Sequence, residues 1–224
     1  MHSIFKNSIY FTKTVNMLKA LYDKDVQTAK HCLAVASYMS VFFNKYASTN
    51  FDSDMIFLCG LLHDIGKIKF PSYLFSDFIV SSEDDWNIIK AHTIYAKQIL
   101  EASNFPYDVV KIVFQHHEKK DGSGYPLSLS LKEIFIEARV LAIADCYTAL
   151  TEERAYRSRV ASQDAVKILV KDNRWYDNRL LRVFIENIND ITLQAESLYN
   201  FYFYKELREV FNRDHVKGNA EKAL

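Results

Sequence analysis

The segment LLHDIGK, residues 61–67, ends an apolar run with a histidine beside an aspartate. Further histidines and an aspartate occur in AHTIYAKQIL (91–100), HHEKKDGSGYP (116–126) and VLAIADCYTAL (140–150). A neutral imidazole and a carboxylate each offer a lone pair to a divalent cation, and their mixture suits iron, manganese, zinc or nickel better than calcium. Together with one earlier histidine, these segments predict a single metal site. Its candidate ligands are His31, His63, Asp64, His92, His116, His117 and Asp145.

The composition is that of an ordinary globular protein with one well-buried domain: 224 residues, 49% hydrophobic and 25% charged. Lysine plus arginine equals aspartate plus glutamate at 28 each, so no overall basic field would attract polymeric nucleic acid or an anionic membrane. The three cysteines, Cys32, Cys59 and Cys146, form no CxxC pair, which argues against a disulfide framework and favours a reducing cytoplasm. The N-terminal residues lack the apolar stretch of a signal peptide, and no run is long enough to span a bilayer.

The scarcity of helix-breaking residues indicates the fold class. Only five glycines and three prolines occur in the chain, which favours long helices over many tight strand turns. Hydrophobic spacing predicts helices over residues 26–46, 55–63, 86–102, 109–117, 132–151, 162–170 and 178–189. Ser82 and Asp108 are the expected caps of the third and fourth of these helices. We therefore predict an all-α protein.

The order and spacing of the motifs resemble the HD-GYP family of bacterial phosphodiesterases. The resemblance runs from about Asp25 to Asp177, through LLHDIGK, AHTIYAKQIL, HHEKKDGSGYP and IADCYTALTEERAYR. It implies an HD-domain-like helical bundle with additional C-terminal helices, a multinuclear metal centre, and hydrolysis of cyclic di-GMP to pGpG or GMP. The chain then divides into an N-terminal helical extension (1–24), a catalytic domain (25–190) and an aromatic-rich C-terminal helix and tail (191–224).

The resemblance also implies a role for each motif residue. One metal would be bound by His31, His63, Asp64 and Asp145, and a second by Asp64, His92, His116 and His117, so that Asp64 bridges them. Iron or manganese is the expected metal, with zinc, nickel or magnesium as alternatives. The catalytic residues would be Asp64 and Lys67. The substrate contacts would be Lys67, Arg154 and Arg157 on the phosphates and Tyr125 on a guanine base, with residues 122–126 shaping the pocket.

Three positions depart from the family pattern. Some members carry a glutamate one helical turn before the first histidine and use it for a third metal. This chain has Gln27 there, and an uncharged amide is a poor ligand for a transition metal, so we expect two metals rather than three. Ala34 replaces a usual arginine and Ala155 a usual proline, which affects the expected substrate contacts more than metal binding.

Several of these residues also have simpler interpretations. A single histidine such as His92 on a half-buried helix is more often a hydrogen-bonded core residue than a ligand, but its companions reverse that expectation. Asp145 lies in an apolar stretch where an unpaired carboxylate is costly, which favours a metal. Arg154 and Arg157 also fit solvated charges at a helix end. Glu118 has two interpretations, a general acid or a partner that orients an imidazole.

The aromatic density of residues 191–212 has two interpretations as well. The favoured one is a last helix packed on the core. The alternative is a homodimer contact, because aromatic residues exposed together mark association surfaces.

Three functions of different classes follow from these observations. The favoured one is a cyclic di-GMP phosphodiesterase, in which two cations convert water into hydroxide and neutralise charge on the phosphoryl oxygens, with cyclic GMP-AMP as an alternative substrate. The second is a non-catalytic cyclic dinucleotide sensor or interaction protein, whose partners would include cyclic di-GMP synthases. The third is a di-iron oxygenase.

Overall fold

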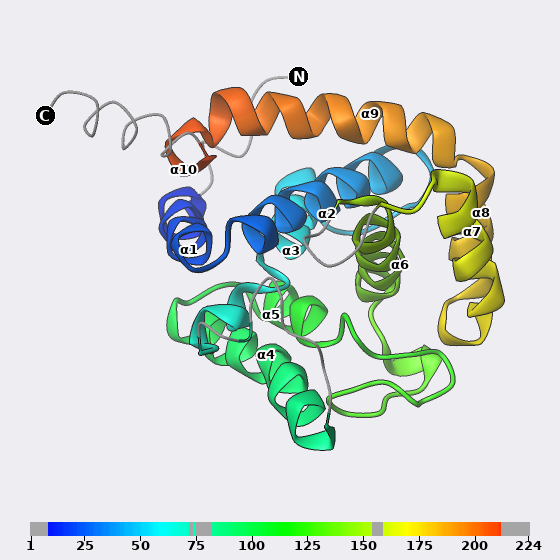
Figure 1. The fold of residues 1–224 in the computed structure, drawn as a ribbon, viewed down its shortest axis with the longest axis horizontal. Helices are drawn as coiled ribbons and strands as arrows, with labels where there is room; N and C mark the ends of the chain where they lie inside the picture. Colours follow the sequence, from blue (N-terminus) through cyan, green and yellow to red (C-terminus); the bar gives the residue numbers. More distant parts are fainter. Residues whose placement is uncertain (1–8, 72–73, 75–81, 154–158, 212–224) are drawn as a thin grey trace, which may run out of the picture.

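The computed structural model describes residues 9–71, 74, 82–153 and 159–211 (Figure 1). These residues form helices joined by turns and loops, and no β-strand occurs among them, so the all-α prediction is confirmed. The α-helices are α1 (Phe11–Lys24), α2 (Val26–Lys45), α3 (Ser53–Leu62), α4 (Glu83–Ala102), α5 (Tyr107–Phe114), α6 (Ile136–Thr151), α7 (Ser162–Lys171), α8 (Asn178–Glu186), α9 (Ile188–Phe201) and α10 (Arg208–Phe211). In the same part of the chain, no helix combines the length and apolar character needed to cross a bilayer.

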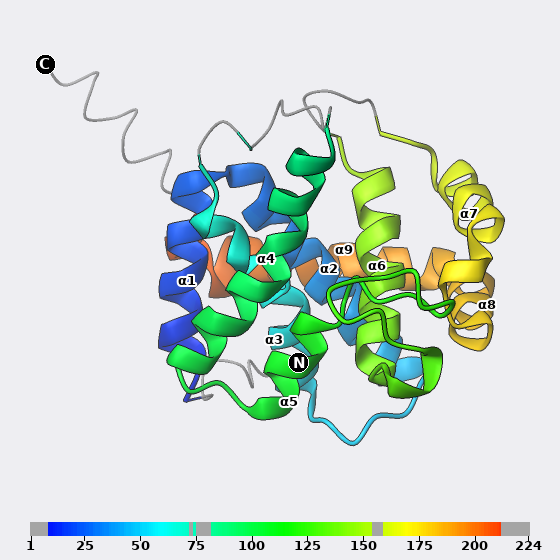
Figure 2. The same cartoon turned by 90° about the horizontal axis from the view of Figure 1, so that it is seen from below.

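Helix α2 is the centre of the bundle. It packs against α1, α3, α6 and α9, which surround it in Figures 1 and 2. Most of its side chains from Ala29 to Phe43 are buried. A helix covered on several sides carries apolar residues around much of its circumference. His31 of α2 is therefore held in the core rather than on a solvated face.

Two glycines let the backbone around His63 and Asp64 approach the neighbouring helices closely. A Cβ atom added to Gly60 of α3 would lie 2.5 Å from Cα of Ala36 in α2. A Cβ atom added to Gly66, in the 3-10 helix η2 (Ile65–Lys69), would lie 1.9 Å from the carbonyl oxygen of His92 in α4. Both distances are far below van der Waals contact, so neither position has room for a side chain. These contacts hold the residues between the two glycines against α2 and α4.

The structure places the start and end of α5 differently from the sequence prediction. The helix begins at Tyr107 after Pro106, so the prediction that Asp108 caps it is wrong. The fixed φ of proline starts the helix earlier, and Asp108 instead lies in its first turn, where a carboxylate complements the helix dipole. The helix also ends at Phe114, which leaves the histidine pair in the turn that follows. By contrast, Ser82 caps α4 as predicted, with its hydroxyl accepting from the backbone N–H of Asp85.

Two of the predicted helices differ from the structure. The helix predicted over residues 132–151 begins only at Ile136, because a separate 3-10 turn (Leu131–Glu133) precedes it, in which the Glu133 carboxylate accepts a hydrogen bond from the backbone N–H of Ser130. The helix predicted over residues 178–189 is divided at Asn187, whose side-chain amide donates to the carbonyl oxygen of Val183 at 2.9 Å and ends α8. Helix α9 then begins at Ile188, and the domain boundary predicted between residues 190 and 191 falls inside it.

The aromatic C-terminal segment packs on the bundle. After α9 the chain forms a short π-helix (Tyr202–Glu206) and then α10. Tyr202 stacks on Phe57 of α3 with ring centroids 4.2 Å apart, and Phe211 meets Tyr22 of α1 edge-on. Tyr202 and Phe211 are buried, which confirms core packing for these two residues, whereas Tyr204 is 61% exposed. The homodimer contact stays a prediction.

Candidate metal centre

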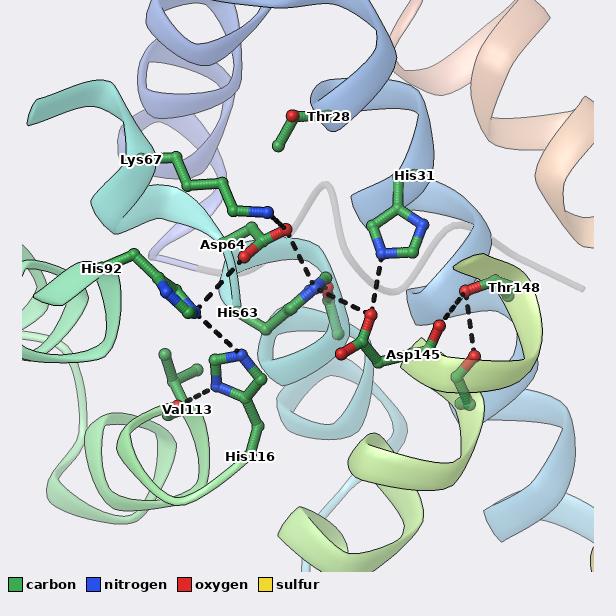
Figure 3. Close-up of polar contacts among 12 residues, drawn as sticks. Thr28, His31, His63, Asp64, Lys67, His92, Val113, His116, Asp145 and Thr148 are labelled. Carbon is green, nitrogen blue, oxygen red and sulfur yellow. Dashed lines mark hydrogen bonds and ion pairs between the residues drawn. The ribbon is translucent and has the colours of Figure 1, made fainter. Parts of the chain in front are cut away.

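The predicted metal ligands come together at one place in the bundle, and Figure 3 shows how most of them converge. They are His31 from α2, His63 and Asp64 from the end of α3, His92 from α4, His116 and His117 from the turn after α5, and Asp145 from α6. Their ligand atoms form three sets in which every atom lies within 4.8 Å of the others: His31, His63 and Asp64; His63, His116 and Asp145; and His92, His116 and His117. Because the sets share members, the candidate ligands surround one centre.

The centre has two halves of different chemistry. We call His31, His63, Asp64 and Asp145 the carboxylate half, and His92, His116 and His117 the histidine half. Asp64 lies at the boundary between them, since its Oδ2 is 3.4 Å from Nε2 of His63 and its Oδ1 is 3.5 Å from Nε2 of His92. On the outer side, Oδ1 of Asp145 lies 3.0 Å from Nε2 of His31.

Backbone contacts fix the tautomer of three of the imidazoles. In His63, Nδ1 lies 2.8 Å from the carbonyl oxygen three residues earlier, and in His92 and His116 the same distance is 2.6 Å. A carbonyl oxygen can only accept, so Nδ1 carries a hydrogen, and in the neutral ring that binds a metal Nε2 presents a lone pair. The short-range helical geometry around each histidine thus prepares it as a ligand through Nε2.

These lone pairs meet no hydrogen-bond donor. The Nε2 atoms of His92 and His116 are 3.2 Å apart, although neither carries a hydrogen in the tautomers given above. Nε2 of His63 is buried and makes no hydrogen bond within the described part of the chain. Facing lone pairs repel unless a cation lies between them, and buried polar atoms without a partner are rare. The donor set therefore fits divalent metal ions, and its imidazoles and carboxylates are ligands that iron, manganese, zinc and nickel accept.

Burial lowers the pKa of every imidazole in the centre, but charged neighbours reverse this effect in one half. In the histidine half, burial lowers the pKa of His92 to about 4 and that of His117 to about 3. In the carboxylate half, nearby carboxylates outweigh burial and raise the pKa of His31 and His63 above the usual value. The imidazoles of the histidine half are thus neutral at neutral pH, whereas those of the carboxylate half favour the protonated, positively charged form.

Lys67 lies at the edge of the centre. Its Nζ donates to Oδ2 of Asp64 at 2.6 Å, and it belongs to η2 rather than to a continuation of α3. Burial alone would lower the pKa of Lys67, but the charge of Asp64 outweighs it and raises the pKa, so the side chain stays an ammonium. Because 28% of this side chain is exposed, the charge borders both the ligand cluster and solvent.

Sequence reasoning missed one carboxylate beside the centre. Nδ1 of His31 donates to Oε2 of Glu152, immediately after α6, at 2.8 Å. Metal-binding histidines usually donate their second N–H to such a partner, which fixes the ring and raises its basicity. Glu152 follows Asp145 by seven residues, a spacing that in a continuous helix would place both side chains on one face, although α6 ends at Thr151 and Glu152 has an extended backbone. That spacing was the available signal.

The HHEKKDGSGYP segment folds back on the histidine half. Glu118 is buried, and its carboxylate accepts from the backbone N–H groups of Leu127 at 2.6 Å and Leu129 at 2.9 Å. The carboxylate therefore anchors the loop, a role that neither sequence interpretation anticipated. Tyr125 donates its backbone N–H to the carbonyl oxygen of His117, and the two ring centroids are 4.8 Å apart. The loop thus places the Tyr125 ring beside the ligand cluster.

The remaining residues singled out in the sequence are two arginines, an alanine and a glutamine. Arg154, Ala155 and Arg157 are outside the described residues. Gln27, where a third metal would require a carboxylate, donates its side-chain amide to the carbonyl oxygen of Glu153 at 3.0 Å. This amide is thus engaged by the backbone, and the expectation of two metals rather than three stays a prediction.

A helical bundle around a buried cluster of histidines and aspartates defines a class of proteins, the HD-domain proteins. A family model described as an HD domain matches residues 14–180, and the chain belongs to this family. Within it, the chain is related to cyclic dinucleotide phosphodiesterases of the HD-GYP type, as the sequence motifs predicted.

Relatives act on more than one cyclic dinucleotide according to their descriptions. The chain is 29% identical over 186 residues to 3′3′-cGAMP-specific phosphodiesterase 2 of Vibrio cholerae, which covers 82% of this chain and 36% of the relative. It is 30% identical over 132 residues to the cyclic di-GMP phosphodiesterase PA4108 of Pseudomonas aeruginosa, covering 58% and 32% of the two chains. The corresponding values for a cyclic di-GMP phosphodiesterase of Thermotoga maritima are 31% over 134 residues, 58% and 36%. The chain thus spans about a third of the length of these curated relatives.

Solved structures share the fold. Bd1817, an HDG"Y"P protein from Bdellovibrio bacteriovorus, superposes with a TM-score of 0.61 at 23% identity, covering 75% of this chain and 53% of that chain. The HD domain of the L. monocytogenes phosphodiesterase PgpH gives a TM-score of 0.55 at 20% identity and covers 82% of this chain and 95% of that chain. The predicted HD-domain fold is therefore confirmed.

Proposed function

We propose that the chain is a metal-dependent phosphodiesterase that hydrolyses cyclic di-GMP to pGpG, GMP or both. The observation that carries this proposal is the pair of facing Nε2 atoms of His92 and His116, 3.2 Å apart, beside Asp64, whose two oxygens reach both halves of the centre. Such a donor set is suited to two cations that share one carboxylate, which is the arrangement used for in-line displacement at phosphorus. The relationship to cyclic dinucleotide phosphodiesterases supports the same reaction class.

Each half of the centre has its own task in this proposal. The carboxylate half would hold one cation and the histidine half a second, with Asp64 common to both. Bound divalent cations lower the pKa of water and neutralise charge on phosphoryl oxygens. Lys67 keeps its positive charge beside Asp64 and would attract and orient the anionic phosphodiester. Asp64 and Lys67 are thus the proposed catalytic residues.

The proposed substrate contacts lie on the loops around the centre. Tyr125 stands against His117 and can present its ring to a nucleobase, as aromatic side chains do in other nucleotide sites. Arg154 and Arg157 are proposed as further phosphate contacts, on the resemblance to the family alone. Iron or manganese is the proposed metal. The proposed location is the cytoplasm, which is supported by cysteines that form no disulfide.

A specific observation favours a second substrate. Two of the related Vibrio cholerae proteins are described as specific for 3′3′-cGAMP, at 29% and 32% identity, close to the 30% of the Pseudomonas aeruginosa cyclic di-GMP enzyme. Identity at this level does not separate the two substrates. We therefore propose cyclic di-GMP as the first substrate to test and 3′3′-cGAMP as the second.

The test is a turnover assay on anaerobically purified protein loaded with iron or manganese. Metal content is measured first, and the loss of cyclic di-GMP and of 3′3′-cGAMP is then followed by chromatography. Turnover that disappears in Asp64→Ala supports the enzyme. Tight binding of cyclic di-GMP without turnover under every metal would instead show a sensor, and oxygen consumption with neither dinucleotide consumed would show an oxygenase.

A further inference from the structure

A cavity of about 720 Å³ lies between α2, α6 and α9 and borders the surroundings of the metal centre. Glu152 lines the cavity and also accepts the Nδ1 hydrogen of His31, and Thr148 lines it and donates its hydroxyl to the backbone carbonyl oxygen of Asp145 at 3.0 Å. None of the candidate metal ligands is among the described residues that line it. Its volume is within the range of about 300–1,000 Å³ usual for small-molecule sites. The cavity is thus separate from the centre and one hydrogen bond away from it.

The floor of this cavity is formed by buried aromatic and hydroxyl groups. Tyr38 and Tyr147 are 8% and 1% exposed. The Tyr38 hydroxyl donates to Oγ1 of Thr192 at 3.2 Å, and the Tyr147 hydroxyl shares a hydrogen bond of 2.7 Å with Oγ of Ser162. These bonds tie α2 and α6 to α7 and α9 and hold the two rings in place. The floor is therefore preformed.

The rim of the cavity is exposed and charged. Arg159, Glu196 and Asn200 line it, and their side chains form no hydrogen bond or ion pair with the rest of residues 9–71, 74, 82–153 and 159–211. Oε1 of Glu152, unlike Oε2, likewise has no donor among these residues. The cavity accordingly offers a carboxylate acceptor inside and a guanidinium at its edge.

A guanine nucleotide matches this arrangement. The Watson–Crick edge of guanine carries adjacent N1–H and N2–H donors, which one carboxylate can accept together. The base can pack on a tyrosine ring, and a guanidinium pairs well with a phosphate. Adenine instead presents an acceptor at N1, which a carboxylate repels. We propose that the cavity binds a guanine mononucleotide, with the base at Glu152 and the phosphate at Arg159.

A ligand in this cavity would change the metal affinity of the carboxylate half of the centre. Glu152 would then share its negative charge between the base and the Nδ1 hydrogen of His31, and a histidine with a weaker acceptor is a weaker ligand. The effect is reciprocal, because each ligand must change the affinity of the other by the same factor. The inference does not require the protein to turn over a substrate. Where the proposed hydrolysis to GMP also holds, the cavity would provide feedback by that product.

Binding is tested by calorimetry on the metal-loaded protein titrated with GMP, with AMP and with guanosine. We expect GMP to bind at least about tenfold more tightly than AMP, because a site built around N–H donors rejects a base that lacks them. Ala34 lines the cavity from α2, so Ala34→Leu should fill it and weaken GMP at least about tenfold while the metal content stays at the wild-type value. At the exposed rim, Arg159→Ala should weaken GMP by up to about fivefold and leave guanosine unchanged.

The same titrations can overturn the proposal. GMP binding that survives both Ala34→Leu and Arg159→Ala but disappears in Asp64→Asn would place the nucleotide in the metal centre. Equal binding of GMP and AMP, or no binding of either, would also reject the guanine site. Loss of cyclic dinucleotide turnover alone would reject the proposed function and leave this inference intact, since binding is read directly.

The coupling is tested by measuring metal affinity with and without saturating GMP. We expect GMP to weaken metal binding by about three- to tenfold in the wild type and by a factor near one in Ala34→Leu. Glu152→Gln should remove the preference for GMP over AMP, because an amide replaces one of the two acceptor oxygens of the carboxylate by an NH2 donor, which repels the N–H donors of guanine. The exposed neighbour Glu153 supplies the matched control, Glu153→Gln, which should behave as wild type. GMP that binds in the cavity without changing metal affinity would refute the coupling.

Discussion

The carboxylate half and the histidine half hold imidazoles of similar burial in opposite electrostatic surroundings. His31 and His63 face carboxylates, and their pKa values are raised despite burial. His92 and His117 lie beside other imidazoles as well as near Asp64, and there burial outweighs the nearby negative charge and lowers their pKa values to about 4 and about 3. The balance between neighbouring charge and burial therefore decides whether a buried histidine in this centre holds a proton.

This contrast bears on how each half would recruit a cation. The carboxylate half offers negative charge, but a cation must displace protons there. The histidine half offers neutral lone pairs that are already free, at least two of them oriented by backbone carbonyl groups. Carboxylate-rich sites accept manganese and magnesium readily, whereas imidazole-rich sites favour iron, nickel and zinc. The two halves are therefore expected to differ in metal preference and in pH dependence.

The largest effect is expected at the residue that the halves share. Asp64→Asn should remove both cations, because a neutral amide replaces the carboxylate that reaches each half, and it leaves Lys67 without its partner. Loss of an outer partner of a ligand already costs about 10- to 100-fold, so turnover should fall by more than about 100-fold. Metal analysis and turnover are measured together, with the exposed Asp84→Asn as the matched control. An Asp64→Asn protein that keeps two equivalents of metal would show that Asp64 is not shared.

Variants confined to one half should remove one cation each. We expect His31→Ala to lower metal content from about two equivalents to about one through the carboxylate half, and His117→Ala to do so through the histidine half. Turnover should fall in both, because two-metal hydrolysis needs both ions. The measurement is elemental analysis of the purified variants, with circular dichroism to establish that they fold. Loss of both equivalents in either variant would mean that the halves bind metal as one cooperative unit.

The halves should respond differently to pH. His31 and His63 have raised pKa values, so they hold protons at higher pH than usual, and metal binding must release them. As the pH falls from about 8 to about 6, affinity in the carboxylate half should decrease by up to about tenfold per pH unit for each proton released. The histidine half should show little change, because the pKa values of His92 and His117 lie well below that window. Metal titrations of His117→Ala and His31→Ala isolate the two responses, and a steeper response in the histidine half would contradict the assignment.

The sequence indicated the candidate metal ligands better than it indicated the side chains that orient them and hold the neighbouring loops. Residue type, spacing and the family resemblance named a set of candidate ligands, and the fold brings their ligand atoms within 4.8 Å of one another in three overlapping sets. Glu152 was missed because its partner, His31, is distant in the sequence, and its spacing from Asp145 alone does not reveal that contact. The roles of Glu118 and Gln27 were also hidden, since each side chain contacts a backbone group whose position only the folded loop determines.

The fold was predictable at the level of helices and less so at their ends. Long helices with clear spacing, such as α2 and α4, occur close to where they were expected. The predicted ends of helices were wrong where a local polar contact competed with the helix, as at Asn187, or where a proline started a helix early, as at Pro106. The arrangement of α3 and η2 against their neighbours depended on Gly60 and Gly66, whose close contacts are long-range and cannot be read from local spacing.

The smallest expected effect concerns the loop that covers the histidine half. In Glu118→Gln, an amide replaces a buried carboxylate that accepts from two backbone N–H groups, so the N–H of Leu127 or that of Leu129 loses its acceptor. A buried donor left unpaired costs about 1–3 kcal/mol, which thermal unfolding should reveal as a lower midpoint. Because Tyr125 lies on this loop, KM for the cyclic dinucleotide should rise while metal content and kcat change little. The exposed Glu101→Gln on α4 is the control. It should change the free energy of unfolding by no more than about 0.5 kcal/mol and leave KM at the wild-type value. If Glu118→Gln instead lost metal from the histidine half, the carboxylate would act on the imidazoles themselves, and the distinction between the loop and the ligand cluster would fail.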